Sequence, residues 1–253
     1  MEKIEDHNKT YKALSSAEAL LLNKIENIPL FSTTIAQRCT GWNRTKIHNT
    51  LFSLKKKRII SAIKKDSFVI TEKIPEHLFS IAVHVTSPAY LSFWTAASYY
   101  GLTEQCIQSL QLVSTKQYKE RTFYGHCIEV ITVTPKRFFG YTLRDDFAIA
   151  EKERLIIDIL YKPEMAGGIK ECQKIIKNVW PDIDQNILLS FLNRFDNKSL
   201  YARLGYLLET CKITSKIEKS LRHKLPKTYV LLNSQKIVTK QYNKKWRVII
   251  NDQ

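Results

Sequence analysis

Apolar residues recur at helical spacing near the start of the chain and predict two short helices. The first follows Ser15 in SSAEALLLNKIEN, where Ser15 is an N-cap and Pro29 prevents the helix from continuing. The second is expected from about Thr33 to Cys39. The sequence Thr40-Gly41-Trp42 then forms a tight break, because a glycine at its centre tolerates a positive φ.

A third helix with two different faces is predicted from an N-cap at Asn43 to about Lys57. Ile47, Leu51 and Leu54 fall at i, i+4 and i+7, so they share the stripe that packs on the other helices. The opposite face is polar and carries side chains able to read base edges in a major groove: Thr45, Lys46, His48, Asn49, Ser53 and Lys56. The N–H groups at the helix start favour a phosphate near Asn43 and Arg44.

Two short β-branched or aromatic runs follow the third helix. Ile59 to Ile63 and Ser67 to Thr71 predict a hairpin that turns at Lys64-Lys65-Asp66. The order of helix, turn, helix and hairpin resembles the winged helix-turn-helix superfamily, with Asn43 to Arg58 as the recognition helix and Lys64 and Lys65 on the wing. Arg58 departs from this pattern, because many such modules close the helix with glycine there, so an irregular helix end is expected.

The remaining chain predicts both strands and helices. Phe79 to Val85 has the composition of an apolar strand, and Ser87-Pro88 starts a helix over residues 89–100 that ends at Gly101. Two strands between Arg121 and Thr134 are expected to turn at Gly125. A helix is expected at Ile149 to Leu160, a loop at 163–168, further helices at about 169–178, 184–194, 197–211 and 214–224, and strands at 228–232 and 246–250.

The fold class expected from this pattern is α+β. An N-terminal winged helix-turn-helix would cover residues 1–78, and a mixed α/β domain would cover residues 79–253. The length of 253 residues favours two domains of ordinary size, each able to bury its own core.

The charge of the chain is unevenly distributed. The formal net charge is +16, of which residues 1–80 contribute +6, residues 81–210 contribute +1 and residues 211–253 contribute +9. A total of this size is compatible with nucleic acid, an anionic membrane surface or an acidic protein partner. The near-neutral middle is typical of a folded body, and the two basic ends are candidates for phosphate-facing surfaces.

The N-terminal basic region is the candidate DNA-binding site. Between Asn43 and Lys65 there are eight Lys or Arg residues and no acid. The candidate contact residues are Thr33, Thr34, Asn43, Arg44, Thr45, Lys46, His48, Asn49, Ser53, Lys55, Lys56, Lys57, Arg58, Lys64 and Lys65. Winged modules also serve as protein-docking scaffolds, and this alternative stays open. Trp42 is interpreted as a core residue between the two helices rather than as a base-stacking residue.

A second basic surface is expected near the C-terminus. Its candidate residues are Lys212, Lys216, Lys219, Arg222, Lys236, Lys240, Lys244, Lys245 and Arg247. Tyr229, Tyr242 and Trp246 lie among them, and interleaved aromatic and cationic side chains suit a phosphate backbone. Two other readings stay open: the lysines form a merely solvated face or contact a protein, and Trp246 and Tyr229 are core residues of the final sheet.

The sequence gives little sign of catalysis, metal binding or a membrane. No nucleotide-binding, metalloprotease or serine-hydrolase motif occurs, so no enzyme activity, cofactor or metal is expected. Glu151, Lys152, Glu153 and Asp158 are interpreted as a solvated charge network on a helix. The five widely spaced cysteines are expected to be buried thiols in a reducing cytoplasm, and no signal peptide or membrane span is apparent.

Four dispersed stretches resemble AbiE-type antitoxins (the AbiEi family) of abortive-infection toxin–antitoxin systems. They are SPAYLSFWTAASYYGLTEQ, FFGYTLRDDFAIAEKERLIIDILY, ARLGYLLE and TYVLLNSQKIVTKQYNKKWRVIIN. The resemblance implies that residues 79–253 form an antitoxin domain. It also implies a monomer that represses its own operon by binding double-stranded DNA at promoter repeats and neutralises a cognate nucleotidyltransferase toxin. The alternative functions are a protein-interaction adaptor and an orphan DNA-binding regulator without a toxin partner.

Overall fold

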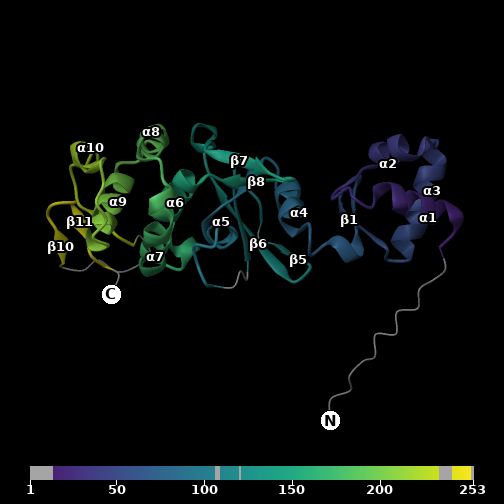
Figure 1. Ribbon diagram of the computed structural model, residues 1–253, viewed down its shortest axis with the longest axis horizontal. Helices are drawn as coiled ribbons and strands as arrows, with labels where there is room; N and C mark the ends of the chain where they lie inside the picture. Colours follow the sequence, from purple (N-terminus) through teal and green to yellow (C-terminus); the bar gives the residue numbers. More distant parts are fainter. Residues whose placement is uncertain (1–13, 106–108, 120, 234–240, 252–253) are drawn as a thin grey trace, which may run out of the picture. The chain divides into compact units, whose positions relative to one another are not determined.

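The computed structural model describes residues 14–105, 109–119, 121–233 and 241–251 (Figure 1). The chain divides into two compact units, Met1–Ile81 and Ala82–Gln253, here called the N-terminal and C-terminal units. The division falls inside a helix, three residues beyond the boundary expected from the sequence. Helices and strands occur together in the chain, so the predicted α+β class is confirmed.

The N-terminal unit begins with three capped helices. They are α1 (Ser16–Ile25), α2 (Thr33–Thr40) and α3 (Arg44–Lys56). The side chains of Ser15, Ser32 and Asn43 each accept a backbone N–H of the first helical turn. Gly41 ends α2 with a φ of 71°, as its place between the two helices predicts. All three helices lie where the sequence places them.

The core of the N-terminal unit is formed by one side of each helix. Ile47, Leu51 and Leu54 of α3 are buried, as their spacing predicts. They form one cluster with residues of the other elements: Leu21, Ile25, Phe31, Ala36 and Ile60. The opposite side of α3 therefore faces away from the core of this unit.

A β-hairpin completes the N-terminal unit. Strands β1 (Ile60–Lys64) and β2 (Ser67–Ile70) are antiparallel, and a short 3₁₀ turn, η1 (Thr71–Lys73), follows. Phe31 and Phe68 exchange two backbone hydrogen bonds of 3.0 and 2.8 Å, which attach the hairpin to the segment before α2. At the hairpin turn, the Asp66 carboxylate accepts the Thr33 N–H at 3.0 Å. The hairpin is thus held to the start of α2 at two separate points.

Residues 79–85 are helical, so the predicted strand is wrong. The helix α4 (Leu78–Val85) buries Ile81, Ala82 and Val85, which are spaced for a helix face. A short, continuous apolar run fits a buried helix as well as a buried strand, and its periodicity alone does not separate the two.

The C-terminal unit contains a six-stranded mixed sheet with the order β5-β6-β4-β3-β8-β7. Its strands are β3 (Ala89–Leu91), β4 (Ser109–Ser114), β5 (Arg121–Phe123), β6 (His126–Thr132), β7 (Tyr141–Arg144) and β8 (Phe147–Ala150). The predicted strand pair that turns at Gly125 is confirmed as β5 and β6. A 3₁₀ turn, η2 (Pro135–Arg137), follows β6.

Two predicted helices begin later than the sequence suggests. Residues 89–91 form β3, and α5 (Phe93–Tyr99) starts only after Ser92, ending before Gly101. Likewise, Ile149 and Ala150 end β8, and α6 (Lys152–Tyr161) starts after Glu151. Ser92 and Glu151 precede these helices without capping them through their side chains, so the local start signals are weak.

Helices α6 to α9 lie between the six-stranded sheet and a small three-stranded sheet (Figure 1). The further helical elements are η3 (Pro163–Ala166), α7 (Ile169–Val179), η4 (Trp180–Asp182), α8 (Gln185–Phe195), α9 (Lys198–Thr210) and α10 (Glu218–His223). The small sheet consists of β9 (Val230–Leu231), β10 (Tyr242–Asn243) and β11 (Val248–Ile249) in the order β10-β11-β9. The four predicted late helices are confirmed, with α10 shorter than expected, and a 3₁₀ turn occupies most of the predicted loop.

A buried ion pair lies inside the C-terminal unit. The Asp158 carboxylate accepts hydrogen bonds from Arg154 Nε at 3.0 Å, Ser92 Oγ at 2.7 Å and Tyr90 Oη at 3.2 Å. The side chains of Arg154 and Asp158 are 0% and 1% exposed. Burial, followed by the nearby Asp158 charge, raises the pKa of Tyr90. The interpretation of Asp158 as a solvated surface charge is therefore wrong.

Candidate functional site

The exposed side of α3 carries most of the predicted base-reading residues. Thr45, Lys46, His48, Asn49 and Lys56 are all exposed, as are Arg44 and Lys55. The Asn43 side chain accepts the Lys46 N–H at 2.9 Å, so its oxygen is engaged in capping the helix. Arg44 Nε lies 3.3 Å from His48 Nε2 across one helical turn. The polar and cationic groups therefore form one continuous face.

The hairpin turn and the end of α3 add further cations. Lys64 and Lys65 are exposed beside Asp66. Arg58 is exposed and adopts a left-handed conformation, with a φ of 61°, directly after the helix. The irregular helix end expected from the missing glycine is thus confirmed. Thr34 is exposed at the start of α2, and Thr33 is half-buried with its N–H bound to Asp66.

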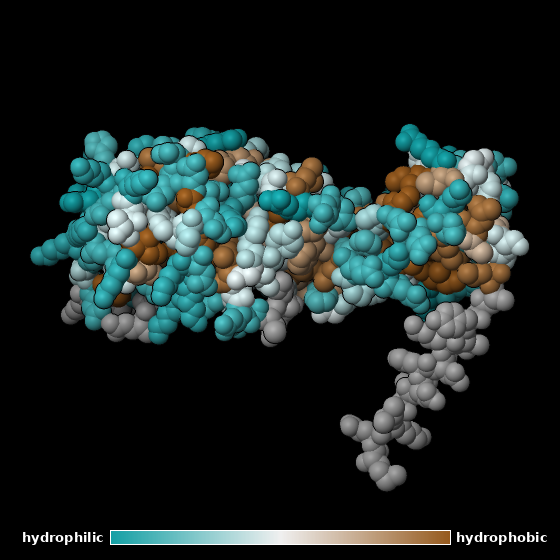
Figure 2. Space-filling model, viewed as in Figure 1, coloured by the Kyte–Doolittle hydropathy of each residue, from teal (hydrophilic) through white to brown (hydrophobic). Residues whose placement is uncertain are grey.

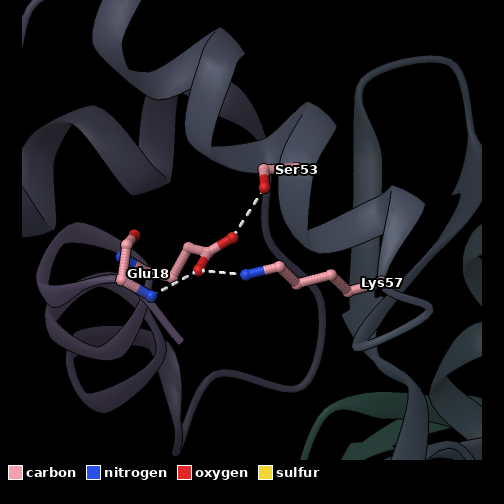
Figure 3. A network of polar contacts seen from close by, with 4 residues as sticks. Glu18, Ser53 and Lys57 are labelled. Carbon is pink, nitrogen blue, oxygen red and sulfur yellow. Dashed lines mark hydrogen bonds and ion pairs between the residues drawn. The ribbon is translucent and has the colours of Figure 1, made fainter. Parts of the chain in front are cut away.

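A buried carboxylate engages two of the predicted DNA-contacting residues (Figure 3). Glu18 of α1 is only 2% exposed. Its carboxylate accepts a hydrogen bond from Ser53 Oγ at 2.7 Å and pairs with Lys57 Nζ at 2.6 Å. It also accepts the Ser15 N–H at 2.7 Å and so completes a capping box. Ser53 and Lys57 therefore bind α3 to α1, and both side chains are engaged within the N-terminal unit.

The contacts of Glu18 lower its pKa strongly. The Lys57 ammonium has the largest effect, burial opposes it, and the Ser53 hydroxyl and Ser15 N–H assist. The pKa falls from 4.5 to about 2. The carboxylate is therefore charged in the folded protein at neutral pH.

Sequence reasoning missed the roles of Glu18 and Phe52. Glu18 occupies the third position of a Ser-capped helix, a signal that indicates the local capping box but not the contact with α3, 35 residues away. Phe52 lies on the exposed side of α3 and is 71% exposed. The helical spacing of Phe52, seven residues after Thr45 and three after Asn49, places it on the polar side of the helix, and this signal could have indicated its exposure.

Trp42 packs against the core of the N-terminal unit, as interpreted from the sequence. It is partly buried, and the Lys46 ammonium lies 4.1 Å from the centre of its ring. This cation–π contact restrains a flexible lysine on the exposed face of α3.

Five predicted residues of the second basic surface meet at an open hollow of about 530 Å³. The described residues that line it include no acid and are Lys219, Arg222, His223, Leu225, Lys244, Lys245 and Arg247. Hydrophilic residues cover most of the region around α10 in the view of Figure 2. Lys212 lines a neighbouring hollow of about 320 Å³, and Lys216 is exposed before α10. Lys236 and Lys240 lie outside the described residues.

Two cations of this surface are engaged within the protein. Lys245 Nζ pairs with the carboxylates of Glu209 and Glu218, whose hydrogen bonds raise its pKa. Arg247 donates to the Pro226 carbonyl at 2.6 Å. Lys219, Arg222 and Lys244 are exposed and remain the better candidates for an external anion.

The aromatic residues of the second surface have different environments. Trp246 is buried and donates its indole N–H to Glu209 at 2.7 Å, which confirms its reading as a core residue. A Cβ added to Gly205 of α9 would lie 2.1 Å from the Trp246 ring, so the helix has room only for glycine there. Tyr229 is 42% exposed, and its reading as a core residue is wrong.

The described part of the chain contains four of the five cysteines. Cys172 is buried, whereas Cys39, Cys127 and Cys211 are only half-buried, so the expectation of buried thiols is wrong for these three. Cys106 lies outside the described residues. Within the same described ranges, no group of three or more His, Cys, Asp or Glu side chains is placed to hold a metal ion. No helix among them has the length and apolar character needed to cross a membrane.

No protein-family model matches this chain, and none of the curated proteins is detectably similar to it. The two basic surfaces, and the residues that hold them in place, are the structural features that indicate a function.

Replacing the buried carboxylate should destabilise the N-terminal unit. For Glu18→Gln we expect the free energy of unfolding to fall by about 1–3 kcal/mol at pH 7, because hydrogen bonds to a charged group are lost. The folded pKa lies below the ordinary value of 4.5, so the stabilisation is present above about pH 4.5 and is lost toward pH 2. The loss of stability is measured by amide hydrogen exchange in α1 and α3, compared between the unchanged protein and the Glu18→Gln variant at each pH.

Glu26→Gln is the matched control, because it removes an exposed carboxylate at the end of the same helix. It should leave exchange in α1 and α3 unchanged. Equal effects of the two substitutions, or a Glu18→Gln effect that persists at pH 2, would show that the buried ion pair is not responsible.

Proposed function

We propose that this chain is a sequence-specific, DNA-binding transcriptional regulator whose N-terminal unit acts as a winged helix-turn-helix. The observation that carries the proposal is the exposed face of α3 together with the hairpin turn. This region presents cations and hydrogen-bonding side chains, and no acid occurs between Asn43 and Lys65. Such a surface matches the phosphates and base edges of a duplex.

The arrangement of the N-terminal unit supports this proposal. The helices α2 and α3 are joined through Gly41, and the hairpin β1–β2 follows α3. In the proposed complex α3 lies in the major groove and the hairpin lies against the backbone as the wing. The Asp66–Thr33 hydrogen bond would hold the wing at a fixed position relative to α2.

The proposed contacts divide into two classes. Thr45, Lys46, His48 and Asn49 lie on the first two turns of the exposed face and would read base edges. The phosphate contacts would come from more peripheral cations: Arg44, Lys55, Lys56, Arg58, Lys64 and Lys65. These contacts supply affinity and orientation but no sequence information.

The basic hollow of the C-terminal unit is proposed as a second phosphate-binding surface. Lys219, Arg222 and Lys244 line it, no acid is among its described lining residues, and the nearby carboxylates of Glu209 and Glu218 pair with Lys245. We propose that this surface adds affinity without base readout, and that the protein acts by binding rather than by catalysis.

We further propose that the chain is the antitoxin of an AbiE-like system, which represses its own promoter and neutralises a nucleotidyltransferase toxin as a monomer. This proposal is supported by the four family-like stretches and is independent of the charge argument. The second of these stretches contains Arg154 and Asp158, and the third contains Gly205, so they include residues that hold the core of the C-terminal unit together. An adaptor or an orphan regulator is the alternative.

Base-reading and phosphate-binding residues should respond differently to substitution. Lys46→Ala and Asn49→Ala should each reduce the preference for a duplex selected from a random library over a scrambled one, by about tenfold. Lys64→Ala/Lys65→Ala should weaken binding to both duplexes and flatten the slope of log K against log salt by about two. Mobility-shift titrations at several salt concentrations measure both effects.

Lys24→Ala, on α1, is the control for loss of one exposed charge. It should change neither the preference for the selected duplex nor the slope of log K against log salt. Equal affinity of the unchanged protein for selected and scrambled duplexes would refute sequence-specific binding.

The second basic surface should contribute affinity alone. Lys219→Ala/Arg222→Ala should reduce the salt slope on a long duplex by about two and leave the preference for the selected sequence unchanged. The matched control is Lys170→Ala/Lys177→Ala, which removes two exposed cations from α7. If both double variants bind DNA like the unchanged protein, the hollow does not contact the duplex.

The antitoxin role is tested by growth rescue. We expect a nucleotidyltransferase-like reading frame beside the coding sequence, and co-expression of the full chain should restore growth of cells that express it. The Lys64→Ala/Lys65→Ala variant should still rescue growth, because neutralisation is assigned to the C-terminal unit. Absence of such a neighbour, or failure of the full chain to rescue, would favour an orphan regulator.

A further inference from the structure

Phe52 is an apolar residue among polar and cationic residues on the exposed face of α3. It belongs to α3, and 71% of it is exposed. The buried stripe of α3 lies on the other side of the helix, where Ile47 and Leu54 are 0% exposed. The core of the N-terminal unit therefore leaves most of the Phe52 ring uncovered, and burying it against a ligand would be favourable.

Phe52 is aligned with the residues proposed to read bases. Thr45, Asn49, Phe52 and Lys56 fall at i, i+4, i+7 and i+11, so they share one stripe of α3. From Thr45 to Phe52 the helix rises by about 10 Å. A helix lying in the major groove can therefore present Thr45, Asn49 and Phe52 to the bases of one short site, with Lys56 beyond them toward the phosphates.

We propose that Phe52 reads the 5-methyl group of a thymine in the major groove. This inference rests on the proposed function and adds a specificity-determining residue to it. Thymine is the only one of the four bases with a methyl group at the groove edge, and an aromatic ring contacts that group without a hydrogen bond. The exposed Lys55 and Lys56 next to Phe52 match the charge of a duplex and bring the ring toward its bases.

The charge around Phe52 also separates DNA from a protein partner. An apolar docking residue is usually surrounded by other apolar residues in a patch. The exposed neighbours of Phe52 on α3 are instead polar or cationic, from Thr45 to Lys56, and this sequence contains no acid. A DNA duplex fits this combination, because it has phosphate charges along its backbone and thymine methyl groups in the groove between them.

The experiment removes the methyl group and the ring separately. A duplex is selected from a random library by the full chain, and each thymine is replaced in turn by deoxyuridine, which differs only by the missing methyl. At one or two positions we expect binding of the unchanged protein to weaken about fourfold, the value for one buried methyl group. Phe52→Ala should bind the original duplex about as weakly as the unchanged protein binds the deoxyuridine duplex. Its affinity should not change further when deoxyuridine replaces thymine at those positions.

Phe52→Ala replaces an exposed residue with the best helix former, so α3 should remain folded, and circular dichroism checks this. Leu20→Ala is the matched control, because Leu20 is 45% exposed on α1, and it should retain the full response to deoxyuridine.

The outcomes separate this inference from the proposed function. If a duplex is selected but no deoxyuridine position matters, or Phe52→Ala keeps the same response, Phe52 does not read a methyl group although the protein binds DNA. If Phe52→Ala instead changes the mass of the free protein in sedimentation and keeps the methyl response, the ring contacts a second copy of the chain. If no duplex is selected, the proposed function fails and the inference fails with it.

Discussion

The exposed face of α3 depends on one buried carboxylate. A charge removed from water is tolerated only when it is paired and hydrogen-bonded, and Glu18 meets this condition through Ser15, Ser53 and Lys57. These contacts order the start of α1 and attach the C-terminal half of α3 to it. The rotation of α3 about its own axis is thereby restrained, and that rotation decides which side chains face outward. The Lys57 ammonium is paired with the Glu18 carboxylate, while the cations on the opposite side of the helix remain exposed.

The sequence predicted the N-terminal unit well because its signals are local. Ser15 and Asn43 cap helices within three residues of themselves, and Gly41 supplies a positive φ that few other residues accept. In the C-terminal unit, tertiary contacts outweigh such signals. The Ser92 hydroxyl donates a hydrogen bond to Asp158, 66 residues away, and no hydrophobic periodicity in the sequence predicts that contact. The same limit applies to the candidate site: its polar face was predicted, whereas the engagement of Ser53 by Glu18 required the fold.

The two basic surfaces hold their cations differently. On α3 and the hairpin turn, the exposed lysines lie in a stretch without acids, and Asp66 beyond it is bound to a backbone N–H. Near the C-terminus, Glu209 and Glu218 pair with Lys245, and Glu209 also binds the Trp246 indole. Part of the excess charge there therefore stabilises the fold around the small sheet. Net charge counted along a sequence overestimates what such a surface offers to an external anion.

The attachment of the hairpin has a consequence for the kinetics of association. Because the Phe31–Phe68 backbone pair and the Asp66–Thr33 bond already hold the hairpin in the free protein, it does not have to become ordered when a ligand arrives. The entropy lost on forming a complex is reduced accordingly. For the proposed DNA complex, the association rate would then be governed by diffusion and electrostatic attraction. The residence time would depend on the contacts that α3 and the hairpin make with the duplex.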